Sequence, residues 1–113
     1  MGVSFETQQL DGKALIVVSA NLDSEEAGKA LSDAFERLYE AENQKTIVLD
    51  LSKVKFINSY GIGRILRCYK RMKSEGGVLM VRPLTGFVKE TFELLMLDNL
   101  FPVDEATGLE SVQ

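Results

Sequence analysis

The chain has 113 residues, a net charge of −4 and a hydrophobic fraction of 45%, which predicts one globular domain, residues 1–113, too small to hold a catalytic domain beside a cofactor domain. It contains no histidine, so the commonest general base near neutral pH and the commonest metal ligand are missing, and we expect neither enzyme activity nor a cofactor. No apolar run approaches the roughly 18 residues of a membrane-spanning helix, and residues 1–6 lack the features of a secretory signal, so we expect a cytoplasmic protein without membrane insertion.

The first 42 residues predict a hairpin followed by a helix. Residues 5–9 and 14–19 are rich in β-forming side chains and are separated by an Asp-Gly turn at 11–12, which is typical of antiparallel strands. Residues 24–42 carry small and aliphatic side chains at helical spacing behind an acidic first turn, which predicts an amphipathic helix. Gly28 lies inside this helix, where glycine is unfavourable.

The middle of the chain predicts a buried strand that leads into a basic helix. Residues 47–51, Ile-Val-Leu-Asp-Leu, are typical of a strand inside a parallel sheet. After Gly61, apolar residues recur at helical spacing while arginines and lysines take the remaining faces. The apolar stripe consists of Ile62, Ile65, Leu66, Tyr69 and Met72.

A pair of glycines then breaks the chain, and four further elements are expected beyond it. Residues 78–81 predict a strand, 85–96 a helix and 100–103 a short final strand, and another helix is expected to start at Asp104. Strands that alternate with helices imply right-handed crossovers. The predicted fold is α/β, a single domain with a mixed, mostly parallel sheet of about four to five strands and helices packed against it.

The junction between the buried strand and the basic helix is the main candidate for a functional site. It holds Asn58 and Ser59, and either side chain suits a helix N-cap, so one interpretation is purely structural. The other is a functional serine, because this loop leaves the carboxyl end of a strand, where open α/β sheets place their sites.

Three nearby features also have both a structural and a functional interpretation. Gly61 and Gly63 follow a strand as a dinucleotide-binding turn would, but Leu66 stands at the third glycine position, which favours tight turning and close packing instead. Asp50 is interpreted as the polar end of a strand rather than a catalytic acid. Cys68 is interpreted as a packing residue rather than a reactive thiol.

Charge is segregated along the chain. Residues 1–50 hold ten acids and four bases, whereas residues 51–89 hold nine bases and one acid, Glu75. The basic helix has no recognised nucleic-acid motif and no interleaved aromatic residues, and the chain as a whole is acidic, so no direct nucleic-acid binding is expected. Docking against an acidic protein surface is favoured, and a solvated helix face is the alternative.

Residues 58–63, Asn-Ser-Tyr-Gly-Ile-Gly, resemble the Asp-Ser-Ser-Gly-Leu-Gly signature of STAS domains, and in particular of bacterial anti-sigma factor antagonists. Two other segments are similar to the family in the same order. Residues 20–23, Ala-Asn-Leu-Asp, resemble its Gly-x-Leu-Asp, and residues 97–103 resemble its Leu-Asp-x-Leu-Phe-x-Ile ending. The resemblance covers nearly the whole chain and implies the STAS fold.

The resemblance also implies a function and a set of site residues. In such proteins the first serine of the motif accepts a phosphate from a partner kinase, so that role falls on Ser59. The expected partners are an anti-sigma factor with serine kinase activity, which the unmodified protein sequesters to free a sigma factor, and a serine phosphatase that acts on phosphorylated Ser59. Phosphorylation ends the binding. The residues expected at the partner interface are Asn58, Tyr60, Gly61, Ile62, Gly63, Arg64 and Arg67.

Two positions depart from the family signature. Asn58 replaces the usual aspartate and keeps its capping ability without its charge. Tyr60 replaces the second serine, and its ring can either crowd a kinase or anchor an interface. These departures keep a second function open, in which the chain is a STAS scaffold or accessory subunit of a stress-signalling or lipid transport complex, without a phosphate cycle.

Overall fold

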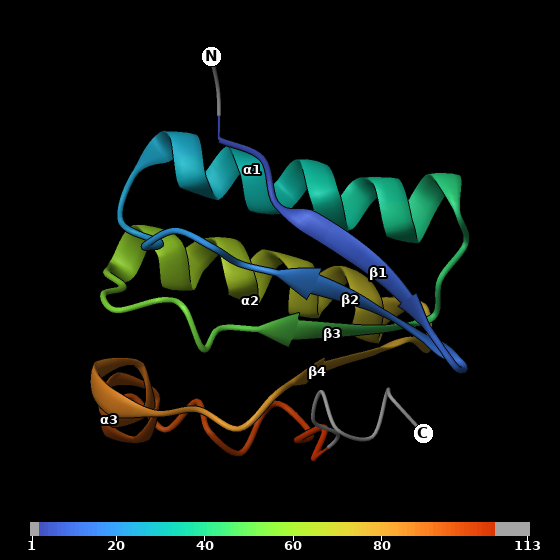
Figure 1. The fold of residues 1–113 in the computed structure, drawn as a ribbon. Helices are drawn as coiled ribbons and strands as arrows, with labels where there is room; N and C mark the ends of the chain where they lie inside the picture. The colour runs from blue at the N-terminus through green and yellow to red at the C-terminus, as the bar shows by residue number, and fades with distance from the viewer. Residues whose placement is uncertain (1–2, 106–113) are drawn as a thin grey trace.

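The structure is a computed structural model that describes residues 3–105. Strands and helices alternate along it after an initial hairpin (Figure 1). The strands are β1 Glu6–Leu10, β2 Lys13–Val17, β3 Thr46–Asp50 and β4 Val78–Val81. The helices are α1 Glu25–Glu36, which continues as the π-helical segment η1 Arg37–Ala41, then α2 Ser59–Ser74 and α3 Gly86–Leu94.

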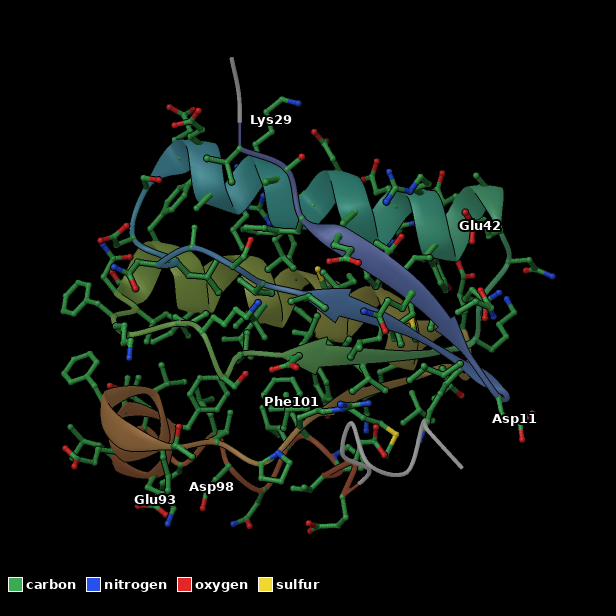
Figure 2. The ribbon with its side chains drawn as sticks, viewed as in Figure 1. Asp11, Lys29, Glu42, Glu93, Asp98 and Phe101 are labelled. Atoms are coloured by element: carbon green, nitrogen blue, oxygen red, sulfur yellow. The ribbon has the colours of Figure 1, made fainter. Side chains whose placement is uncertain are left out.

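The strands form one sheet in the order β1-β2-β3-β4. The predicted hairpin is confirmed, because β1 pairs antiparallel with β2 and Gly12 in its turn has a φ of 78°, in the left-handed region that favours glycine. Asp11 marks the tip of this hairpin at one corner of the molecule (Figure 2). β2, β3 and β4 pair in parallel, so the sheet is mixed and mostly parallel, as predicted.

The expected final strand at residues 100–103 is wrong. This segment makes only a single parallel bridge to β4, between Val81 and Val103. The Val81 N–H donates to the carbonyl of Pro102 at 3.0 Å, and the Asp104 N–H donates to the carbonyl of Val81 at 2.8 Å. Pro102 has no N–H with which to extend the pairing, so within residues 3–105 the sheet has four strands.

Helix boundaries differ from the predicted ones at three places. The α-helical part of the 24–42 segment ends at Glu36 and gives way to η1. α3 ends at Leu94, because Met96 has a φ of 59° and so leaves helical geometry. α2 begins at Ser59 rather than after Gly61. The further helix expected from Asp104 lies outside the described residues, apart from residues 104 and 105, which are not helical. No helix in the described part of the chain is long and apolar enough to cross a membrane.

α1 and α2 lie side by side over one face of the sheet, and α3 lies past β4 (Figure 1). Sequential strand order with right-handed crossovers requires this, since each crossover then places its helix on the same side. Alternate residues of the strands point toward these helices and form the core. They are Ala14, Ile16, Ile47, Leu49, Leu79 and Val81, and Val18 and Leu51 continue the alternation one residue beyond β2 and β3.

Aromatic packing and an ion-pair cluster anchor the segment after α3. Phe101 points inward (Figure 2), is 3% exposed and packs edge-on against Tyr69 with ring centroids 5.3 Å apart. Asp104 is buried, accepts a hydrogen bond from Lys13 Nζ at 2.8 Å and lies 3.5 Å from Arg82 Nε. These contacts tie the segment both to the hairpin and to the end of β4.

Candidate functional site

The loop between β3 and α2 is bound tightly to the loop between β2 and α1. The side-chain oxygen of Asn21 accepts hydrogen bonds from the backbone N–H groups of Lys55 and Phe56, at 2.9 and 3.0 Å. Leu22 pairs with Ile57 in a short parallel bridge. The start of α2 therefore has a fixed position, set by a side chain that sequence reasoning did not single out.

Asn58 is the N-cap of α2, which settles which of the two candidate residues caps the helix. Its Oδ1 accepts hydrogen bonds from the N–H groups of Tyr60 and Gly61, at 3.0 and 3.2 Å. Its Nδ2 donates to the carbonyl of Asp23 at 3.3 Å. An aspartate can make the two capping bonds but has no N–H for the third, so asparagine here links α2 to the loop before α1 in a way that the family's usual residue cannot.

Ser59 is the first residue of α2 and its side chain is exposed. Its hydroxyl makes no hydrogen bond with any residue from 3 to 105. The site is at the positive end of a helix, where an added anion is stabilised by the helix dipole and by N–H groups. Asn58 provides the cap, so modification of the Ser59 hydroxyl would break no capping hydrogen bond. Modification of a capping serine would break one and lower the stability of the helix.

Close packing requires glycine at position 61. This confirms the interpretation of Gly61 as a residue that allows close packing. A Cβ built on Gly61 would lie 2.1 Å from the backbone oxygen of Leu22, far inside van der Waals contact. A Cβ on Gly63 would meet nothing within 4 Å. Gly63 is exposed, whereas Gly61 and the following Ile62 are buried.

Tyr60 lies against α1. A Cβ on Gly28 would be 2.7 Å from Cε2 of the Tyr60 ring and 3.0 Å from Cγ of Arg64, so glycine inside α1 makes room for this ring. Arg64 holds the arrangement, because its Nη2 donates to the Tyr60 hydroxyl at 2.8 Å and its Nη1 donates to Ser32 Oγ at 2.9 Å. The ring remains 38% exposed, so it braces α2 on α1 and still presents one side to solvent.

Coupling between Gly28 and Tyr60 is testable by urea unfolding of a double-mutant cycle. In the wild-type background Gly28→Ala should lower the free energy of unfolding by about 1–2 kcal/mol, because the new methyl group meets the Tyr60 ring. In a Tyr60→Ser background the same change should cost less or become neutral, because the ring is gone and Arg64, at 3.0 Å from the new Cβ, is no longer held by the Tyr60 hydroxyl. Equal effects in the two backgrounds would show that the two residues are not coupled.

The basic charges of α2 divide into two groups. Near its carboxyl end, Arg71 forms an ion pair with Glu40 and lies 3.9 Å from Glu36 of α1. The other basic side chains of α2, Arg64, Arg67, Lys70 and Lys73, form no ion pair with any residue in the described part of the chain. The positive charges of Arg64 and Arg67 are therefore not neutralised by ion pairs with the acidic α1.

Cys68 is 4% exposed and faces the core. Burial raises the pKa of its thiol to about 12, so at neutral pH the thiol is protonated and unreactive. This agrees with its interpretation as a packing residue. Among residues 3–105 no group of three or more histidine, cysteine, aspartate or glutamate side chains has a geometry that would hold a metal ion.

Comparisons with known proteins concern the sequence and the fold. A region of 62 residues is 31% identical to BtrV of Bordetella bronchiseptica, provisionally named an anti-sigma factor antagonist, and covers 55% of this chain and 53% of BtrV. The match thus spans about half the length of that relative.

Solved structures share the fold over most of the chain. A provisionally named anti-sigma factor antagonist of Thermotoga maritima superposes with a TM-score of 0.80 at 20% identity, covering 96% of this chain and 95% of that one. The Bacillus cell fate determinant SpoIIAA in its phosphorylated form gives a TM-score of 0.71 at 16% identity, covering 96% of both chains. Residues 4–108 match the family model of the STAS domain. The chain therefore belongs to the STAS domain family.

Proposed function

We propose that this STAS domain is an anti-sigma factor antagonist that binds an anti-sigma factor with serine kinase activity and is switched off by phosphorylation of Ser59. The observation that carries the proposal is the exposed Ser59 hydroxyl, free of hydrogen bonds to residues 3–105 and fixed at the first residue of α2. Supporting it, the fold is shared with SpoIIAA, which exists in a phosphorylated form.

The proposed interface is a surface around Ser59 with two kinds of contributors. Tyr60, Gly63 and Arg67 are exposed and Arg64 is half-buried, so these residues offer direct contacts. The other predicted interface residues act from within: Asn58 caps α2, the buried Gly61 lets the helix approach Leu22 closely, and Ile62 is buried in the core. Arg64 and Arg67, which form no ion pair with residues 3–105, favour an acidic partner surface.

Phosphorylation would act on the interface rather than on the fold. A phosphate adds about −1.5 to −2 charges and three acceptor oxygens. At the first residue of α2 this anion is favourable within the domain. In a complex, however, it faces the acidic partner surface, and its desolvation is costly. A serine phosphatase would then restore binding.

A permanent scaffold or accessory subunit is the second candidate function. The observation that favours it is the brace formed by Tyr60, Arg64 and Gly28, which occupies the position of the family's second serine with a fixed contact. Neighbouring genes distinguish the two candidates, because a kinase and a sigma factor support the switch whereas transporter subunits support the accessory role.

Direct binding tests the proposal. Each anti-sigma factor kinase encoded in the same genome is titrated with the unmodified protein by calorimetry, and displacement of its sigma factor is followed by a transcription assay. We expect one kinase to bind with a Kd in the micromolar range or below and to release its sigma factor. Arg67→Glu should weaken this binding, whereas Lys73→Glu, the same charge reversal at the far end of α2, should not. Failure of every kinase to bind would refute the proposal.

A further inference from the structure

Phe56 and Phe87 form an exposed aromatic pair close to Ser59. Their rings are stacked, with centroids 5.1 Å apart and planes 17° from parallel. The side chains are 43% and 46% exposed. Single exposed apolar residues are ordinary on a protein surface, but these two come from segments far apart in the sequence and form one apolar platform, here called the Phe56–Phe87 platform.

The platform is rigid. The N–H of Phe56 donates to the Asn21 side chain at 3.0 Å, and its carbonyl accepts from the N–H of Leu22 at 3.1 Å. Phe87 lies in the first turn of α3, which is anchored by the fully buried Val88 and Phe92. Figure 1 shows the β3–α2 loop and α3 at the same edge of the molecule. A partner that covers such a preorganised surface loses little conformational entropy in ordering it.

The platform has basic residues on the side of the β3–α2 loop, whereas on the side of α3 the exposed Glu90 lies one helical turn from Phe87. Lys53 and Lys55 are exposed, lie in the same loop as Phe56, and form no ion pair with any of residues 3–105. An apolar centre with two lysines in the loop that holds Phe56 is complementary to an apolar side chain that has acidic residues on that side. Phe56 is also close to Ser59 along the same rigid loop, so both lie within the area that one partner would cover.

We propose that the Phe56–Phe87 platform is the apolar centre of the surface that docks the anti-sigma factor, with Ser59 toward its margin. The occupant is an apolar side chain of that factor, with acidic residues on the side that faces the β3–α2 loop. This inference rests on the proposed function. It also explains why a single phosphate on Ser59 would be enough to prevent binding. The phosphate would lie beside an aromatic contact that excludes water, so it would have to lose its own hydration before the complex could form.

Two apolar side chains that are more exposed than either phenylalanine supply a matched control. Leu94 and Met96, at the carboxyl end of α3, are 82% and 81% exposed. Their sequence neighbours Glu93 and Asp98 are acidic and point into solvent (Figure 2). An acidic partner surface would be repelled there.

The test measures the affinity of the anti-sigma factor kinase identified by calorimetry for three variants. Phe56→Ser combined with Phe87→Ser should weaken binding at least 30-fold, in the range of interface hot spots. Leu94→Ser combined with Met96→Ser should change it less than threefold. Lys53→Glu combined with Lys55→Glu replaces only exposed charges, so it should stay folded, slow association at least tenfold at low salt and reduce the dependence of association on salt.

The outcomes separate this inference from the proposed function. If wild type binds a kinase and the folded phenylalanine variant binds it equally well, the platform is refuted while the proposed function stands. If wild type binds no kinase, both are refuted. If the phenylalanine variant fails to fold, the lysine variant decides, because an unchanged association rate would by itself overturn the docking surface.

Discussion

Ser59→Asp should abolish binding to the anti-sigma factor while leaving the domain fully folded. A carboxylate at the first residue of α2 meets the positive end of the helix dipole, which is worth about 0.3–1 kcal/mol. We therefore expect a melting temperature equal to that of wild type or about 2–4 °C higher. In the proposed complex the same charge would face an acidic partner surface, so we expect at least a 30-fold loss of affinity, which corresponds to about 2 kcal/mol.

Ser74→Asp is the matched control for this variant. Ser74 is the exposed last residue of the same helix, and its hydroxyl donates to the carbonyl of Arg71 at 2.9 Å. A carboxylate at that end is unfavourable to the helix dipole, so Ser74→Asp should be slightly less stable than wild type and should bind normally. Calorimetry and thermal melting of the two variants give both readouts. Normal binding by Ser59→Asp would show that charge at this site does not control the interface.

Gly61→Ala should be among the most destabilising single-methyl changes in the domain. The added Cβ would lie 2.1 Å from the backbone oxygen of Leu22 and 2.7 Å from the Leu22 Cβ. Neither atom can swing aside as the end of a long side chain can, so α2 must move away from the loop that holds it. We expect the free energy of unfolding to fall by about 3 kcal/mol, from denaturant titration. Anti-sigma factor binding should weaken as well, because the start of α2 is displaced.

Gly63→Ala tests whether this cost comes from the clash rather than from loss of glycine. Gly63 lies in the same helix, and a methyl group added to it would have no neighbouring atom within 4 Å. Alanine there should raise the free energy of unfolding by up to about 1 kcal/mol through helix propensity. Similar losses in the two variants would contradict the close approach of Gly61 to Leu22.

Most of the fold is predictable because its signals are local. The Asp-Gly turn indicates the hairpin, and the strand predicted at 78–81 has the observed bounds. Strand–helix alternation fixes the parallel part of the sheet. The errors arise where contacts with distant parts of the chain override the local sequence preference. Residues 100–103 have a strand-like composition, but Pro102 limits them to one bridge with β4.

The candidate site was only partly predictable, for a different reason. Asn58 and Ser59 are both good capping residues, so their order could not decide which one caps α2; the hydrogen bonds of Asn58 did. The sequence held one clue to the brace. Glycine is unfavourable inside a helix, so Gly28 indicates that another side chain packs closely against α1 at that position. The Phe56–Phe87 stack left no such clue, because it depends on where α3 lies relative to the β3–α2 loop.

Intact-mass spectrometry with peptide mapping tests the central claim most directly. The protein is incubated with ATP and the anti-sigma factor kinase that binds it, and Ser59→Ala is treated in the same way. We predict a single phosphate confined to Ser59 and none on the Ser59→Ala variant. Absence of any phosphate, under conditions in which the same kinase modifies an Asp-Ser-Ser protein of the family, would contradict the switch and favour a permanent binding subunit.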